Sequence, residues 1–201
     1  MLATQKVRRY DPTTSSWMDP VASTNPAWIY HWLMTDCPAV VRRIADDRVD
    51  TLSIANWAGE CDDKGYTIGF MMSDGRALGD ILRDVAAAGR GSFGVRNGQY
   101  SIVRDLPQTV PVQMFTPANS NNFSMQRVFT QPSHGLRVTF TNPEATWQND
   151  VITAYADGYD ESNATQFETL DLGMVIDPIA AWKLGRYHLA VEWNRPNTYS
   201  F

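Results

Sequence analysis

The six residues from Gly89 to Gly94, GRGSFG, have the spacing G-x-G-x-x-G of dinucleotide-binding loops. In such a loop a strand precedes the glycines and a helix follows, so that the pyrophosphate meets the free N–H groups of the helix N-terminus. Here the order is reversed, because a helix predicted over 76–88 precedes the glycines and a strand follows them. The kinase pattern also fails, because Val95 directly follows Gly94. The glycines therefore lie at the carbonyl-rich end of a helix, and we expect no bound nucleotide or other cofactor.

The three histidines offer general-base chemistry, but no motif surrounds them. His31, His134 and His188 lie outside any H-E-x-x-H frame, and the chain has no G-x-S-x-G elbow. We expect His31 and His188 on helices and His134 in a turn, all as solvated or hydrogen-bonded surface side chains. Cys37 and Cys61 lack the spacing of a zinc site, and we expect two free, buried thiols.

Two groups of carboxylates could hold a hard cation: DDKG at 62–65 and DGYDE at 157–161. Neither has the spacing of a calcium loop, and solvation of a helix end or a loop explains them equally well. Trp17, Trp147 and Tyr159 are candidates for an exposed binding face, and burial or subunit contact is an equally open alternative. Motifs alone therefore assign no catalytic, cofactor-binding or metal-binding residue.

The charge of the chain argues against nucleic acid and membrane surfaces. The 201 residues include 17 basic and 22 acidic side chains, a net charge of -5, without a basic block. No apolar run approaches the roughly 20 residues that span a bilayer, and MLATQKVRRYDP has no signal-peptide core. We expect no specific nucleic-acid binding.

The N-terminal half predicts helices. Residues 1–24 contain the turn sequence DPTTSS, and we expect an extended arm or linker with a turn. Asn25-Pro26 is a helix start, since Asn caps the free N–H groups and Pro fits the first turn; this helix ends near Asp36. Asp50 caps a second helix, which ends by Gly65.

A strand, a helix and a hairpin are expected next. Residues 66–72 are a short strand candidate, and Ser73 or Asp74 caps the helix at 76–88, which carries the clearest apolar stripe of the chain. Gly89 is expected in the left-handed conformation that ends many helices. Asn97-Gly98 between two apolar runs predicts a two-residue hairpin turn.

The C-terminal half is rich in proline and predicts short strands. Segments 136–141 and 151–155 alternate as strands, and 157–165 is expected as an exposed acidic loop. Asp177-Pro178 starts a helix that runs to about Trp193. Residues 197–201 are expected to begin a strand, with the chain ending in mid-domain.

These elements define an α+β protein. We expect an arm at 1–24, an α+β module at 25–106, and a β-rich portion with a C-terminal helix at 107–201.

Several ordered motifs resemble one protein family. The strings are NPAWIYHWLM, SIANWAGECDDKG, ALGDILRDVAAAGRGSFG with its hairpin, DLPQ, FTPAN, LRVTFTNP and PIAAWKLGRYHLA. In this order they are similar to the central part of the tail tip attachment proteins, or host specificity proteins J, of lambda-like siphophages. The resemblance covers nearly the whole chain. It departs at CPAVVRRIADDRVD, where the family has a Tyr-Gly-Leu-Gly turn.

The resemblance implies a structural hub at the tail tip of a phage or prophage. The implied fold is a helix-plus-hairpin module joined to part of an antiparallel β-barrel. The implied assembly is a homotrimeric ring in the virion tail tip, made in the host cytoplasm and in contact with distal tail, tape-measure and tip assembly proteins. The implied roles are tail assembly, host attachment and DNA passage, without catalysis, cofactor or metal. The host receptor is contacted by parts of the family protein outside these residues.

A different class of function remains open beside this structural role. Carboxylates gather between Asp157 and Glu168, which suits a cell-wall glycan hydrolase, and exposed aromatics would suit a carbohydrate-binding module. A hydrolase requires two carboxyl groups held about 5–10 Å apart across a cleft.

Overall fold

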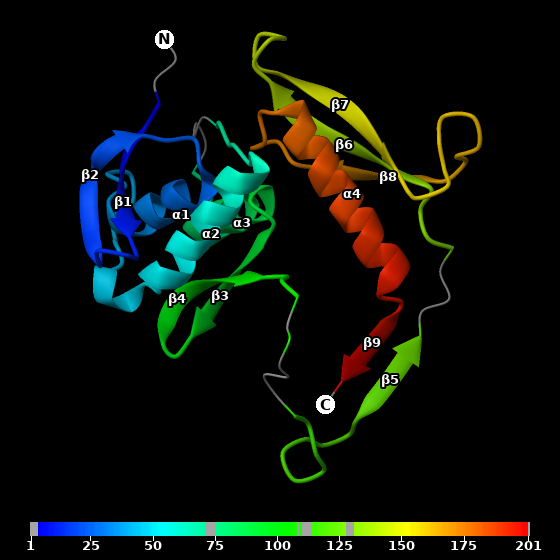
Figure 1. Cartoon of the computed structure of the whole chain (residues 1–201), viewed down its shortest axis with the longest axis horizontal. Coiled ribbons are helices and arrows are strands. Elements are labelled where there is room, and N and C mark those ends of the chain that lie inside the picture. Colours follow the sequence, from blue (N-terminus) through cyan, green and yellow to red (C-terminus); the bar gives the residue numbers. More distant parts are fainter. Residues whose placement is uncertain (1–3, 71–74, 108, 110–113, 128–130, 201) are drawn as a thin grey trace.

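The computed structural model describes residues 4–70, 75–107, 109, 114–127 and 131–200. The fold is mixed α+β, as predicted. The described residues form four α-helices, one short 3-10 helix at Asp46–Arg48 and four small sheets (Figure 1). Three of these sheets are antiparallel pairs and the fourth has three strands.

The N-terminal segment is a packed hairpin. Strands β1 (Lys6–Asp11) and β2 (Ser16–Ala22) pair antiparallel, and Val7 of β1 is buried in the core. Arg8 forms ion pairs with Asp36 and Asp46. The turn was predicted, but the arm or linker was not the right interpretation. The strands are held by contacts to residues far along the chain, which a local pattern does not contain.

Three helices form the first layer. They are α1 (Pro26–Thr35), α2 (Thr51–Lys64) and α3 (Leu78–Ala88), and they confirm the predicted helices. The predicted caps of the first two are present: the Asn25 side chain accepts from the Ala27 amide, and Asp50 accepts from the Ser53 amide. Helix α1 lies between α2, α3 and the β1–β2 hairpin, so nearly all of its residues are buried.

Helix α3 is followed by the predicted hairpin. Strands β3 (Gly91–Arg96) and β4 (Gln99–Arg104) pair antiparallel. Asn97 and Gly98 have φ of 52° and 79°, the positive values that the two-residue turn requires. Strand β4 packs on α2, and the Tyr30 hydroxyl of α1 donates to the Ser101 carbonyl.

The segment before α3 and the start of this helix differ from the prediction. The helix begins at Leu78, with Ala77 at the cap position, and Ser73 and Asp74 lie outside the described residues. Of the strand predicted at 66–72, residues 66–70 contribute one bridge, from Ile68 to Val175, while 71 and 72 lie outside the described residues.

The predicted left-handed glycine at the end of α3 is wrong. Gly89 has φ of -101°, and the next residue, Arg90, takes the positive φ of 57°. The reason for a glycine here is therefore space and not backbone conformation.

The second layer is an open sheet covered by a helix. Strands β6 (Gly135–Asn142) and β7 (Gln148–Tyr155) confirm the predicted pair, and β8 (Phe167–Asp171) joins the other side of β6 in parallel. Helix α4 (Pro178–Asn194), capped by Asp177 as predicted, lies across one face (Figure 1). The described residues form no closed barrel.

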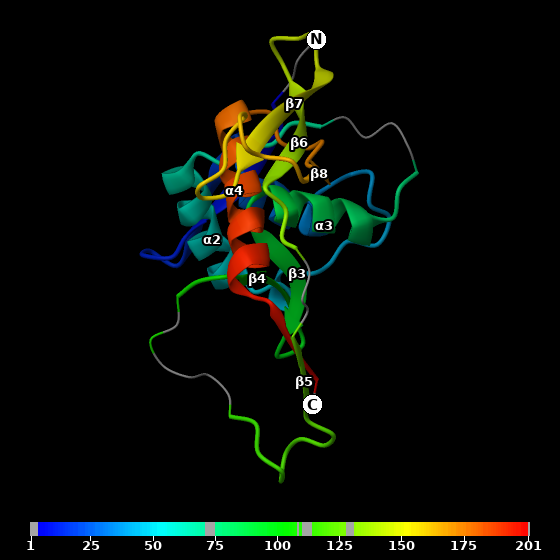
Figure 2. The same cartoon turned by 90° about the vertical axis from the view of Figure 1, so that its right-hand side faces the viewer.

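A two-stranded ribbon extends beyond α4. Strand β9 (Asn197–Ser200) was predicted, and its partner β5 (Ser124–Arg127) was not. Figures 1 and 2 both show the ribbon leading away from the helices. We call β5, β9 and the loop 114–123 the terminal ribbon.

One cluster of buried apolar side chains joins the two layers. It contains Trp57 and Tyr30 of the helical layer together with Val138 and Leu184 of the sheet layer. The core therefore continues across the boundary expected at residue 106.

Helix α4 approaches the sheet at a glycine, which makes a testable prediction. A Cβ on Gly185 would lie 2.7 Å from Val138 Cγ2 and 2.9 Å from Ala154 Cβ. We expect Gly185→Ala to lower the free energy of unfolding by about 2 kcal/mol, because overpacking outweighs the gain in helix propensity. Chemical denaturation measures it. Gly59→Ala is the control, because that helical Cβ meets nothing within 4 Å and should be neutral or stabilising. Equal effects of the two substitutions would contradict close packing at Gly185.

Candidate functional site

The GRGSFG segment is a packing joint between α3 and β3. It follows a helix and enters a strand, which confirms the predicted order. The Trp57 indole Nε1–H donates to the Gly89 carbonyl at 2.7 Å. A Cβ on Gly91 would lie 2.8 Å from the side chain of Ile102 across the hairpin. The glycines thus allow close contacts within the protein.

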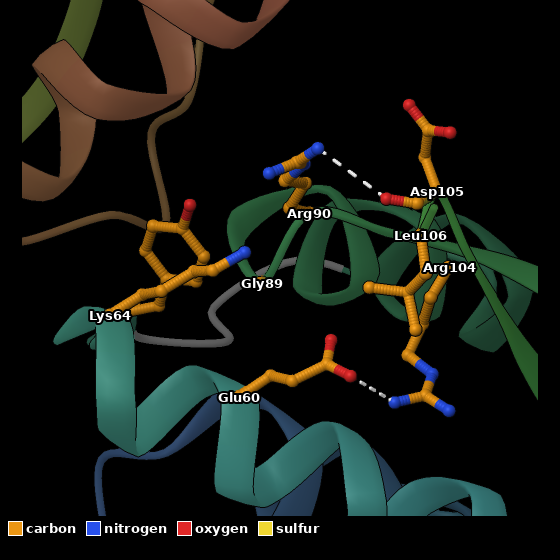
Figure 3. Close-up of a pocket in the computed structure, with 8 residues that line it drawn as sticks. Glu60, Lys64, Gly89, Arg90, Arg104, Asp105 and Leu106 are labelled. Atoms are coloured by element: carbon orange, nitrogen blue, oxygen red, sulfur yellow. Dashed lines mark hydrogen bonds and ion pairs between the residues drawn. The ribbon is translucent and has the colours of Figure 1, made fainter. Parts of the chain in front are cut away.

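A small hollow lies beside this joint (Figure 3). Its volume is about 10 Å³, room for about one water molecule. Most of its charged groups are engaged: Glu60 pairs with Arg104, Arg90 donates to the Asp105 carbonyl oxygen, and Arg195 binds the Asp105 carboxylate. The hollow has no space for a substrate.

Asp105 is the centre of a polar cluster that joins the two layers. Its carboxylate accepts hydrogen bonds from the Tyr187 hydroxyl at 2.9 Å and from Arg195 at 2.8 Å. The Arg90 guanidinium lies over the Tyr187 ring, 3.9 Å from its centre. The hydrogen bonds from Arg195 and Tyr187 hold the pKa of Asp105 below its usual value, so the carboxylate is charged at neutral pH. We call Arg90, Asp105, Tyr187 and Arg195 the junction cluster.

The junction cluster positions α4 against the helical layer. Asp105 follows β4, Arg90 follows α3, and Tyr187 comes from the middle of α4. One helical turn before Tyr187, Lys183 donates to the Lys64 carbonyl at the end of α2, where the helix dipole favours a cation. These contacts are suited to fixing two layers together. Sequence reasoning missed the cluster because its members lie up to 105 residues apart, from Arg90 to Arg195, and match no motif.

His31 is buried, contrary to the prediction of a surface histidine. Only 1% of it is exposed, because α1 is covered on all sides and the Trp17 ring packs 4.8 Å from the imidazole. Its Nδ1 is 3.3 Å from the Thr35 hydroxyl, and its Nε2 has no hydrogen-bond partner among the described residues. Burial lowers the pKa of His31 to about 4, so it is neutral at pH 7.

The other two histidines and the two cysteines are also packed against or buried within the protein. His134 stacks on Tyr159 with ring centres 4.0 Å apart, and His188 is half-buried, which lowers its pKa. Cys37 and Cys61 are free, buried thiols, as predicted, and burial raises the pKa of Cys61. Among the residues that the structure describes, no three His, Cys, Asp or Glu side chains gather as metal ligands.

The three candidate aromatics do not form one face. Trp17 packs against Tyr10 and His31 within the first layer, with Arg8 over its ring. Trp147 is in the turn between β6 and β7, and Tyr159 is in the predicted exposed loop. The aromatic neighbours of Tyr159 are His134 and Trp193, which lie in a different part of the molecule from those of Trp17.

The carboxylate pair of a glycosidase is missing from both described hollows. In the hollow of Figure 3, Glu60 and Asp105 are each bound by an arginine. A second hollow, beside α4, has Asp157 as its one carboxylate. Neither offers a free acid and base flanking a sugar.

The terminal ribbon exposes a group of large apolar side chains. Phe123 and Tyr199 stack with ring centres 6.4 Å apart, and Met125 pairs directly opposite Tyr199. An isolated pair of strands is marginally stable in water, and exposed apolar groups on open edges are typical of contact surfaces. The exposed members are Met114, Phe115, Phe123, Met125 and Tyr199.

No family model matches this chain, and a search of curated proteins finds no match. Within the described residues, no helix is long and apolar enough to cross a membrane.

Proposed function

We propose that this chain is the central hub region of a phage or prophage tail tip protein, in the family of the tail tip attachment proteins. Its role is structural, in tail assembly, host attachment and DNA passage. The observation that carries the proposal is the meeting of three family-like motifs in the junction cluster. Arg90 belongs to AAAGR, Asp105 to DLPQ and Tyr187 to LGRY. The Arg90 side chain contacts the Tyr187 ring and the Asp105 backbone carbonyl, and the Tyr187 hydroxyl donates to the Asp105 carboxylate.

The contacts among Arg90, Asp105 and Tyr187 give a physical argument for the resemblance. Motifs that lie far apart in the sequence have a reason to occur together if their residues hold one fold. Gly89, at the packing joint, belongs to the same string as Arg90, and the cap residue Asn25 belongs to a further family-like string. Residues of the family-like strings thus lie where helices and strands of this protein contact one another.

The proposed assembly is a homotrimeric ring. A threefold ring is built from head-to-tail interfaces, so each subunit needs two surfaces that complement each other. The terminal ribbon supplies exposed apolar side chains and open strand edges for such a contact. In the proposed hub, the sheet β7-β6-β8 and the ribbon are two parts of one barrel, linked by α4, in which the described pairs are antiparallel except for β6 with β8. Distal tail, tape-measure and tip assembly proteins are the proposed partners.

Light scattering on the protein as its gene encodes it tests this proposal. We expect three times the monomer mass, and a strictly monomeric protein at high concentration would refute the ring. Met125→Ser with Tyr199→Ser should dissociate the trimer at least tenfold more readily, because both side chains lie on one face of the ribbon. Val41→Ser is the control, since Val41 is also exposed but lies outside the ribbon. Thermal melting of each variant checks that the subunit itself stays folded.

A further inference from the structure

A second hollow, of about 160 Å³, lies on α4, and none of its lining residues belongs to the junction cluster. Arg186, Leu189, Ala190, Trp193 and Asn194 line it with the spacing of one helix face, and Ala156 and Asp157 form the opposite wall. Drug-sized ligands occupy pockets of about 300 Å³ or more, so this hollow fits a single ring. The proposed hub function uses none of these side chains.

The hollow has an apolar wall that is held in place. The Trp193 Nε1–H donates to the Ser133 carbonyl at 3.0 Å, and 41% of the residue remains exposed. Tyr159 packs against the indole with ring centres 5.9 Å apart and stacks in turn on His134. A ligand that covers this indole therefore finds a ring whose freedom is already restricted, which lowers the cost of binding.

The rim of the hollow is polar and nearly neutral. Arg186 donates to the Tyr155 carbonyl and to one oxygen of Asp157, whose side chain is 95% exposed. Asn194 donates one amide hydrogen to the Ala190 carbonyl. A guanidinium has five N–H donors and a carboxylate accepts at two oxygens, so donors and acceptors remain for a ligand beside the indole.

We propose that this hollow is a binding subsite for one pyranose ring of a neutral glycan. The C–H face of the sugar packs on the Trp193 indole, and neighbouring hydroxyls bond to Asp157 and Arg186. A hydroxyl both donates and accepts, which suits a paired carboxylate and guanidinium. The exposed Asp157 opposes an anionic ligand. A purely apolar ligand would cover polar groups of the Arg186–Asp157 pair without replacing their hydrogen bonds to water. The subsite does not depend on the hub function.

The test is a ¹H–¹⁵N NMR titration of the full chain with glucose, galactose, N-acetylglucosamine and their short oligomers. At least one saccharide should move the Trp193 indole resonance with a Kd on the order of 1 mM. Trp182 is the matched control, because it is similarly exposed on the same helix but lies eleven residues, about 16 Å, away. Its indole resonance should stay in place.

Variants separate binding from folding. Trp193→Ala and Asp157→Asn should each weaken binding about tenfold or more, and Trp182→Ala should not. Trp193→Phe keeps an aromatic face and should retain part of the affinity if Trp193→Ala unfolds the helix end. The subsite is refuted if no saccharide moves the Trp193 resonance, or if Trp182 moves equally. If a free nucleoside bound more strongly than every saccharide, the hollow would be assigned to a nucleobase and not to a sugar. If the Trp193 resonance moved with protein concentration alone, the hollow would be assigned to contact with a second copy of the chain.

Discussion

Replacing Gly89 with alanine should lower the free energy of unfolding by about 3 kcal/mol, the larger end of the range for overpacking a core. The new Cβ would lie 2.4 Å from Trp57 Cζ2, 2.9 Å from Trp57 Cε2 and 3.1 Å from Cys61 Sγ. The indole cannot move aside easily, because it is buried and its Nε1–H is bonded to the Gly89 carbonyl. Urea denaturation followed by far-ultraviolet circular dichroism measures the loss.

Gly65→Ala is the matched control, because Gly65 also follows a helix. It has the left-handed φ of 71° and open space around its Cβ, so alanine there costs only backbone strain, about 1 kcal/mol. A double-mutant cycle with Trp57→Phe completes the test, since the smaller ring should reduce the cost of Gly89→Ala. A cost at Gly89 no larger than at Gly65, or one unchanged by Trp57→Phe, would contradict the steric explanation.

Gly89 also shows what sequence reasoning can and cannot reach. The position of the glycine at the helix end was predicted correctly, because that signal is local. The reason for the glycine was not predicted correctly, because the indole that occupies the space beside it belongs to Trp57 of another helix, 32 residues earlier. The caps at Asn25, Asp50 and Asp177 were likewise local and correct.

The errors concern elements held by distant partners. Strand β8 has the polar sequence FETLD and exists because it pairs in parallel with β6. Strand β5 has no apolar alternation and is defined by β9. The β1–β2 hairpin packs through Val7 and through Arg8, which binds two carboxylates from later in the chain.

The candidate sites also divide into local features, which the sequence predicts, and contacts between distant residues, which it does not. The order of helix and strand around GRGSFG was predicted correctly, because that order is a local property. The sequence could not place Arg90, Asp105 and Tyr187 together, since no rule of spacing relates them. The hollow on α4 was equally hidden, although its five helical residues share one face, because its other wall comes from the loop after β7.

Acid should destabilise the protein through His31. Its pKa is about 4 in the folded protein, against 6.5 for an ordinary histidine, because burial penalises the charged imidazolium. The unfolded chain therefore binds the proton more tightly, and stability falls as the pH drops from 6.5 to 4. The difference corresponds to about 3 kcal/mol, fully present above pH 6.5 and lost by about pH 4. Denaturation at a series of pH values measures it.

The groups that face His31 allow this effect to be separated from general acid sensitivity. Burial is the largest influence on the pKa of His31 and lowers it, and Arg8 acts in the same direction. Asp46 and Asp36 favour the charged imidazolium, but burial outweighs these two carboxylates. His31→Gln removes the titration and should flatten the stability curve between pH 6.5 and 4. Asp46→Asn removes an attraction that raises the pKa of His31 in the folded protein, so the acid loss should still begin near pH 6.5 but extend to lower pH and become larger. His188→Gln should change the curve less, because His188 is only half-buried. Asp105, whose pKa is also lowered, contributes stability that is lost only below its usual pKa of 3.8. If the His31 ring protonated near pH 6.5 in the folded protein, as followed by NMR, burial would not control it and the pH dependence would have another source.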